Sequence, residues 1–113
     1  MDGRIEFLQP ILHYGGHFIA PLLIAAALWR SEWRRYGAVM VAANLIDLDH
    51  LLADPIFDPE RCSVGFHLLH GWEAGLAYLA MMLVPRWWVR ALGAGAFWHL
   101  TVDYGDCVMQ TLP

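Results

Sequence analysis

A 23-residue stretch without a charged side chain, Phe7–Trp29, constrains the fold more than any other feature of the sequence. As an α-helix it would reach about 34 Å, which is long enough to cross the roughly 30 Å hydrocarbon core of a bilayer. The whole chain of 113 residues is 58% hydrophobic and 16% charged, whereas about a quarter of the residues in an ordinary soluble domain are charged. We therefore expect a small integral membrane protein that forms a single domain over residues 1–113.

Charges and helix breakers divide the rest of the chain into further apolar segments. Arg30–Arg35 and a second turn that begins at Pro85 are short and basic, and the longer polar segment from Asp54 to Gly65 contains two prolines. Pro21 marks a position where the first helix can kink. The expected fold class is all-α, an integral membrane four-helix bundle with helices over Phe7–Trp29, Tyr36–Ala53, Phe66–Val84 and Trp88–Val108.

The distribution of arginines predicts which helix ends face the cytoplasm. Five of the seven arginines lie in the two basic turns, and the sequence has no lysine. Because cytoplasmic loops are enriched in positive residues, we expect these turns inside the cell and both termini outside. The N-terminus lacks the basic region and the prompt cleavage site of a signal peptide, so the first helix is expected to stay in the membrane. Acidic residues outnumber basic ones by eleven to seven, which argues against a nucleic-acid partner.

Every histidine of the chain has a histidine or an aspartate three or four residues away. His99 and Asp103, for example, are spaced i,i+4, which places them on one helix face where they can bind the same metal ion. Polar residues at helix ends near water are the alternative explanation, but the expected topology brings all four pairs to the outer side of the membrane. The candidate metal ligands are His13, His17, Asp47, His50, His67, His70, His99 and Asp103.

Eight candidate ligands exceed the four that one zinc ion binds, so we expect a cluster of two or three divalent ions. Mixed nitrogen and oxygen ligands fit zinc, and they also fit iron or manganese. Asn44 is expected to be a hydrogen-bonding neighbour of the cluster. Asp49 either orients an imidazole or acts as a general base, and Glu73 is either a ligand or a general base. Asp54 and Asp106 are expected to be loop or cap residues.

The two cysteines, Cys62 and Cys107, are both expected on the outer side. In an oxidising compartment they can form a disulfide that ties the loop before the third helix to the end of the fourth. The alternative is two free, buried thiols, because the sequence does not give the distance between the two residues.

Four motifs together resemble those of the small bacterial inner-membrane proteins known as membrane-bound metal-dependent hydrolases. The motifs are Gly16-His17, Ile46-Asp47-Leu48-Asp49-His50, Leu69-His70-Gly71 and His99-Leu100-Thr101-Val102-Asp103. Gly65 stands where that family carries a further histidine, and His13 and His67 are additions. The resemblance covers most of the chain and is closest to a short, uncharacterised branch. It implies a bacterial inner-membrane location and a metal site similar to that of zinc-dependent phospholipase C.

The residues and the resemblance together imply a metal-dependent hydrolase that acts on a phosphoester at the outer face of the inner membrane. Metal-activated water would attack a lipid head group or a polyprenyl phosphate, and Asp49 or Glu73 would accept the proton. The expected partners are therefore membrane lipid and a small-molecule or lipid phosphoester. Two other classes of function remain open, namely a non-enzymatic metal-binding or metal-transport protein and a di-iron membrane oxygenase.

Overall fold

The computed structural model describes residues 3–52, 62, 64 and 68–110, and every regular element in these ranges is helical. The all-α fold class is thereby confirmed. The elements are α1 (Gly3–Phe18), α2 (Ala20–Leu28), the 3-10 helix η1 (Arg30–Glu32), α3 (Trp33–Ala42), the 3-10 helices η2 (Ala43–Leu52) and η3 (Leu68–His70), α4 (Trp72–Met81) and α5 (Trp87–Gln110).

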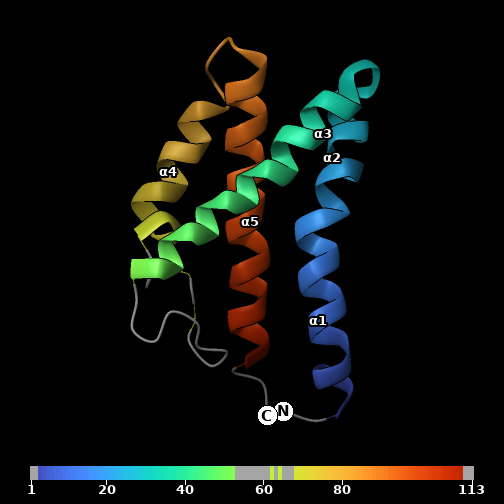
Figure 1. The fold of residues 1–113 in the computed structure, drawn as a ribbon, viewed down its shortest axis with the longest axis vertical. Coiled ribbons are helices and arrows are strands. Elements are labelled where there is room, and N and C mark those ends of the chain that lie inside the picture. Colours follow the sequence, from blue (N-terminus) through green and yellow to red (C-terminus); the bar gives the residue numbers. More distant parts are fainter. Residues whose placement is uncertain (1–2, 53–61, 63, 65–67, 111–113) are drawn as a thin grey trace.

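Helix α5 is the centre of the fold, and α1, α3, α4 and η2 all pack against it (Figure 1). Two glycines allow its neighbours to approach closely. A Cβ atom on Gly95 would lie 2.6 Å from the Cα atom of Met40 in α3, and one on Gly93 would lie 2.6 Å from the carbonyl oxygen of Tyr78 in α4. Small residues on α5 therefore set the spacing of the helices that carry the polar side chains described below.

The first predicted helix is broken at Ile19, and its halves α1 and α2 are bent by 42°. Pro21 lies in the first turn of α2 and has no N–H, so the carbonyl oxygen of His17 loses its usual helical donor. Asn44 in η2 replaces that donor, because its Nδ2 donates to the His17 carbonyl over 2.9 Å. A hydrogen bond thus connects η2 to the end of α1 at the predicted kink.

The second predicted helix changes type partway, from α-helix in α3 to a 3-10 helix of ten residues in η2. A 3-10 helix has three residues per turn, so residues i and i+3 are eclipsed rather than about 60° apart. Asn44, Asp47 and His50 therefore form one row, whereas Leu45, Leu48 and Leu51 form a second row with exposed side chains. The expectation of a continuous α-helix over Tyr36–Ala53 was therefore wrong over Ala43–Leu52.

The third predicted helix is shorter than expected, and the fourth is close to its expected length. Helix α4 begins at Trp72, after the short helix η3 and an extended Gly71, and it ends at Met81. The start predicted at Phe66 lies outside the described residues. Helix α5 runs from Trp87 to Gln110, one residue earlier and two residues later than predicted.

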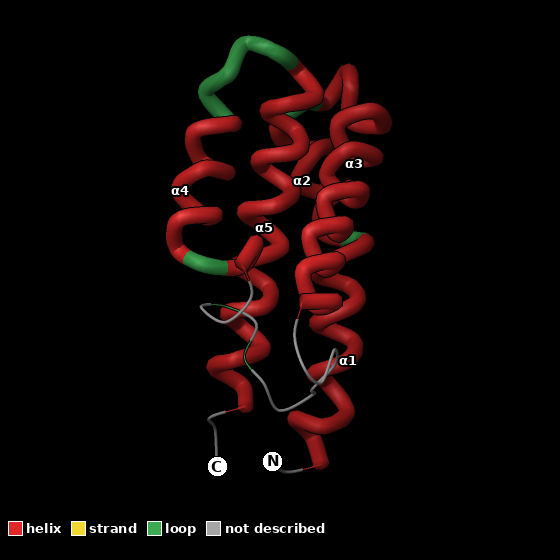
Figure 2. The backbone as a smooth tube through the Cα atoms, turned by 60° about the vertical axis from the view of Figure 1, so that its left-hand side comes forward, coloured by secondary structure: helices red, strands yellow, loops and turns green. Residues whose placement is uncertain are grey.

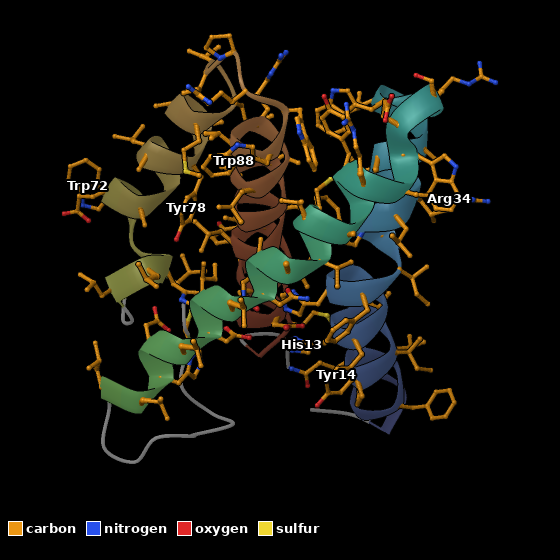
Figure 3. The ribbon with its side chains drawn as sticks, turned by 45° about the horizontal axis from the view of Figure 1, so that its top comes forward. His13, Tyr14, Arg34, Trp72, Tyr78 and Trp88 are labelled. Carbon is orange, nitrogen blue, oxygen red and sulfur yellow. A yellow bond between two sulfur atoms is a disulfide. The ribbon has the colours of Figure 1, made fainter. Side chains whose placement is uncertain are left out.

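Among the described residues, small and polar side chains fill the interior and large apolar side chains cover the outside. The buried apolar residues are five alanines, two tyrosines and one methionine, and the buried polar residues are histidines and aspartates. Leucines, isoleucines and aromatic residues such as Trp72 point outward (Figure 3). Large exposed apolar surfaces mark contact with another protein or with a membrane.

The two arginine-bearing turns lie together at one end of the fold, and the start of α1 and the end of α5 lie at the other end (Figures 1 and 2). This up-and-down arrangement is the one expected from the sequence. In the described ranges, no single helix meets the length and hydropathy of a membrane span, although the bent pair α1 and α2 does. Insertion as four membrane spans therefore stays a prediction.

Candidate metal centre

Four side chains from three elements, η2, η3 and α5, direct ligand atoms to one point. Nε2 of His70 lies 3.2 Å from Oδ1 of Asp47 and 3.1 Å from Oδ2 of Asp103. Nε2 of His99 lies 3.0 Å and 3.1 Å from the same two oxygens. Ligands about 2.0–2.1 Å from a tetrahedral zinc ion lie roughly 3.3 Å from one another. The spacing of these atoms, which we call the central group, is therefore that of a metal coordination shell.

The hydrogen bonds of the two imidazoles identify which nitrogen can bind a cation. Nδ1 of His70 donates to Oδ2 of Asp49 over 2.8 Å, and Nδ1 of His99 donates to Oδ1 of Asn44 over 2.8 Å. In a neutral imidazole the other nitrogen, Nε2, then carries a lone pair. With both imidazoles neutral, two nitrogen lone pairs and two carboxylates face one another at about 3 Å, and a cation at the centre of the group would compensate them.

Asp49 holds η2 and η3 together on the side of His70 away from the central group. It is almost fully buried, with 1% of its side chain exposed. Its Oδ2 accepts from both Nδ1 of His70 and the backbone N–H of Leu69, each over 2.8 Å, and its Oδ1 is paired with Nδ1 of His50 at 3.1 Å. Tyr78 fixes the same turn from α4 by donating to the carbonyl oxygen of Leu69 over 2.7 Å. This arrangement orients His70 for a metal, as carboxylates behind metal-bound histidines commonly do.

Asn44 orients the imidazole of His99 and connects three elements, η2, α1 and α5. Its amide nitrogen donates to the carbonyl oxygen of His17 in α1, so its Oδ1 is the atom that accepts from His99 in α5. The direction of these two bonds fixes the orientation of the amide. The predicted role of Asn44 as a hydrogen-bonding neighbour of the cluster is confirmed.

A second group of candidate ligands shares Asp103 with the first. Oδ1 of Asp103 lies 3.0 Å from Nε2 of His17, while its Oδ2 faces the central group. His13, His17 and Asp103 together offer ligand atoms close enough for one further ion, and we call them the outer group. Nδ1 of His13 is also paired with Asp106. A carboxylate with one oxygen toward each group is placed to bridge two ions.

The structure brings together six of the eight predicted ligands in these two overlapping groups: His13, His17, Asp47, His70, His99 and Asp103. His50 belongs to neither group, and its Nδ1 instead contacts the carbonyl oxygen of Asp47 at 3.0 Å and Asp49. His67 lies outside the described residues. Glu73 also belongs to neither group, and it is exposed in the first turn of α4.

Asp106 was expected to be a loop or cap residue, but it pairs with His13 beside the outer group. The signal that could have identified it was present in the sequence, because Asp106 is spaced i,i+3 from Asp103. We used the same spacing to identify Asp47 with His50.

A disulfide between Cys62 and Cys107 closes the same end of the fold. It ties the chain a few residues before η3, which carries His70, to the turn of α5 that follows Asp103. Of the two alternatives left open by the sequence, the disulfide is the one found. Disulfides persist mainly in oxidising compartments outside the cytoplasm, so this end of the molecule is typical of an extracytoplasmic environment.

The fold and the site define a small helical protein with a buried His/Asp cluster that can hold metal ions. The chain belongs to a family of unknown function, DUF6122, whose model matches residues 7–110. No curated protein and no solved structure matches the chain. The description of the family names no activity.

Proposed function

We propose that this protein is a membrane-embedded, metal-dependent hydrolase that cleaves a phosphoester of a lipid at the outer face of the bacterial inner membrane. The observation that carries the proposal is the convergence of two imidazole nitrogens and two carboxylates in the central group, at contacts of 3.0–3.2 Å. The resemblance to the membrane-bound metal-dependent hydrolases supports the same reading.

The distribution of side chains supports placement in a membrane. Large apolar residues cover the outside of the described helices, while alanines, glycines and ionisable residues face the interior. Helices in a bilayer pack through small residues, and ionisable residues there face the interior of the bundle. The longest dimension of the fold is 42 Å, which matches the roughly 40–45 Å of a bilayer with its head-group regions.

The donor set supports a borderline metal ion such as zinc, with iron or manganese as the alternatives. Both groups offer only imidazole nitrogens and carboxylate oxygens, whereas magnesium and calcium prefer oxygen ligands alone. Both cysteines are held in the disulfide, so no thiolate takes part. The shared carboxylate of Asp103 supports a site for two ions.

The exposure of Asp47 supports access of a substrate to the central group from the side of Asp47. Its side chain is 48% exposed, whereas those of His70, His99 and Asp103 are 0%, 1% and 8% exposed. Asp47 lies beside the exposed row of Leu45, Leu48 and Leu51, which are 60–66% exposed. A substrate that reaches the ion past Asp47 therefore meets an apolar surface, which suits a molecule with a polar phosphoester and a hydrocarbon tail.

A bound divalent ion would lower the pKa of a water ligand to about 7 and polarise the phosphoester. The chain itself orients the ligands, since Asp49 and Asn44 hold the two imidazoles with Nε2 toward the centre. Asp49 has both oxygens engaged, so in this proposal it positions His70. Glu73 is then the remaining candidate for the general base.

The test is a hydrolysis assay on the purified, zinc-loaded protein with bacterial phospholipids and polyprenyl phosphates. Phosphate or phosphorylated head groups should be released, and Asp103→Ala should remove both metal and activity because the ions lose a bridging charge. Thr101→Ala is the matched control, since Thr101 is exposed on α5 two residues earlier and bonds only to the Phe97 carbonyl among the contacts described. If Glu73 is the base, Glu73→Gln should keep the metal and lower turnover by roughly 10²–10⁴-fold.

A second candidate function is metal binding or transport without catalysis. It is favoured by one observation, namely that the central group already offers the four ligands that fill a tetrahedral zinc site. The outer group offers three, which leaves a position for water and favours the enzyme. A metal-loaded protein that hydrolyses none of the substrates, with every ion fully coordinated by side chains, would reject the hydrolase in favour of this second function.

A further inference from the structure

We propose that the turn between α2 and α3 binds the head group of an anionic phospholipid. This end of the molecule lies opposite the metal centre and has no part in the chemistry above. The proposal rests on the membrane placement in the proposed function, but not on the metal or the hydrolysis.

The turn forms an open hollow of about 330 Å³ that is lined by Arg30, Ser31, Glu32, Trp33, Arg34 and Arg35. We call it the arginine hollow. Its volume lies at the lower end of the range for small-ligand sites, which begins at about 300 Å³. Five of the six lining residues, three arginines, a serine and a tryptophan, carry side-chain hydrogen-bond donors, and the sixth is Glu32. Such a lining suits a phosphate, because guanidinium groups match phosphate oxygens in geometry and charge.

One of the three arginines is held in place by its neighbours, and two are available. Nε of Arg35 lies 2.8 Å from Oε2 of Glu32, and its guanidinium lies 4.5 Å from the centre of the Trp87 ring in α5. Glu32 is the one carboxylate in the two turns of this end, which together contain five arginines. Arg30 and Arg34 therefore have no carboxylate in the turns left to pair with, and Figure 3 shows Arg34 at the edge of the bundle.

The aromatic residues around the hollow place it at the level of lipid head groups. Trp29 stacks on Tyr36 at 4.5 Å, Tyr36 contacts Trp87 at 5.5 Å, and Arg34 lies 5.5 Å from the Trp33 ring. Tryptophan and tyrosine gather where hydrocarbon meets head groups. Basic residues at that level attract the anionic lipids of the cytoplasmic leaflet. Charge and depth together favour an anionic phospholipid over a soluble phosphate compound as the occupant.

The experiment counts lipids bound to the purified full-length protein by native mass spectrometry. The protein is exchanged into micelles that contain equal amounts of phosphatidylglycerol and phosphatidylcholine with identical acyl chains. The wild type should retain phosphatidylglycerol in preference to phosphatidylcholine. The double variant Arg30→Gln/Arg34→Gln should reduce this preference about tenfold or more, because each basic residue near the surface contributes substantially to anionic-lipid binding.

The matched control is Arg4→Gln/Arg61→Gln, which changes the net charge equally but lies at sequence positions assigned to the opposite side of the membrane. It should keep the preference of the wild type. Three results would each overturn the proposal: an equal loss in both double variants, no preference in the wild type, or complete displacement of phosphatidylglycerol by an equal concentration of inorganic phosphate. The last result would identify the hollow as a site for a free anion.

The same samples separate this proposal from the proposed function. Metal content and phosphoester hydrolysis should be unchanged in Arg30→Gln/Arg34→Gln, since both substitutions lie at the far end of the fold from the metal centre. If the protein binds metal but shows no lipid preference, only the proposed lipid site is rejected. If it shows the lipid preference but binds no metal, only the proposed hydrolase is rejected.

Discussion

The two side-chain hydrogen bonds of Asn44 connect α1 and α5 at the candidate metal centre. A single amide side chain replaces the backbone donor that Pro21 removes from α1 and fixes the tautomer of His99 in α5. Both hydrogen bonds require η2 to pass next to the break between α1 and α2. Pro21 removes a backbone donor there, and Asn44, which is far away in sequence, supplies another.

Replacing Asn44 by alanine should lower metal affinity roughly 10–100-fold, the usual effect of losing a partner of a metal-bound histidine. The imidazole of His99 would then be free to rotate or to change tautomer. Zinc titration of the purified variant measures the effect. Thr101→Ala, on the exposed side of α5, should bind zinc as the wild type does. An unchanged affinity in Asn44→Ala would show that packing alone holds His99.

Helical spacing in the sequence was enough to identify every residue of the two groups. The six residues that were predicted and that converge are His13, His17, Asp47, His70, His99 and Asp103. The roles of the residues that contact these ligands were less predictable. Whether Asp49 faces an imidazole or a substrate depends on the path of η3, which the spacing within η2 cannot give.

At the scale of elements, the sequence predicted where helices lie better than what type they are. Pro21 correctly marked the bend in the first helix. The change from α-helix to 3-10 helix at Ala43 had no comparable signal, because residues 38–52 contain no proline or glycine. Contacts of Asp49 with η3 and of Asn44 with α1 hold η2 from two sides, and such tertiary contacts override local preference. Long 3-10 segments are uncommon and often occur at functional sites.

Gly95 should be intolerant of even a methyl group, because a Cβ there would lie 2.6–2.9 Å from backbone atoms of Met40. Gly95→Ala should therefore destabilise the protein by about 1–3 kcal/mol, a typical cost of overpacking. Gly105→Ala in the same helix is the control, since a Cβ at Gly105 has nothing within 4 Å, and it should be neutral or stabilising by up to about 1 kcal/mol. Thermal unfolding in detergent measures both variants. Equal effects would contradict close packing of α3 against α5.

The disulfide should stabilise both the fold and the metal centre. Removing it in Cys62→Ser/Cys107→Ser should cost about 2–5 kcal/mol of stability, because the cross-link restricts the unfolded chain. It should also weaken zinc binding, since the segment leading into η3 is no longer tied to α5. Adding a reductant to the wild type should reproduce both effects and should leave the double variant unchanged. Metal affinity that survives loss of the disulfide would show that Asp49 and Tyr78 suffice to hold η3.

At the scale of the whole molecule, the basic turns and the candidate metal centre are separated along α5. The two basic turns lie at one end of the fold (Figure 1), whereas Asp103 and the disulfide-bonded Cys107 belong to the half of α5 that leads to the other end. In the proposed function this separation corresponds to one orientation in the membrane. The sequence alone predicted this division from the positions of the arginines. It could not show that alanines, glycines, histidines and aspartates would fill the interior, because that follows from which faces of the helices meet.

The orientation can be tested by labelling single cysteines in intact bacteria with an impermeant maleimide. The native cysteines are held in the disulfide, so a cysteine at position 31 or 111 would be the one reactive thiol. Ser31→Cys should not react from the periplasm, because the positive-inside rule places its turn in the cytoplasm. Thr111→Cys should react readily. Labelling of Ser31→Cys without permeabilisation would reject this topology, and membrane-free recovery of the protein would reject insertion altogether.

The central claim, that the His/Asp cluster is a metal centre, is tested most directly by the metal content of the purified protein after equilibration with zinc and removal of unbound ions. We predict two ions per chain in the wild type, one in each group, and a loss of one ion in His13→Ala, which affects only the outer group. Asp103→Ala should lose nearly all metal, since Asp103 belongs to both groups. A folded, disulfide-bonded wild type that retains no more metal than Asp103→Ala would contradict the account.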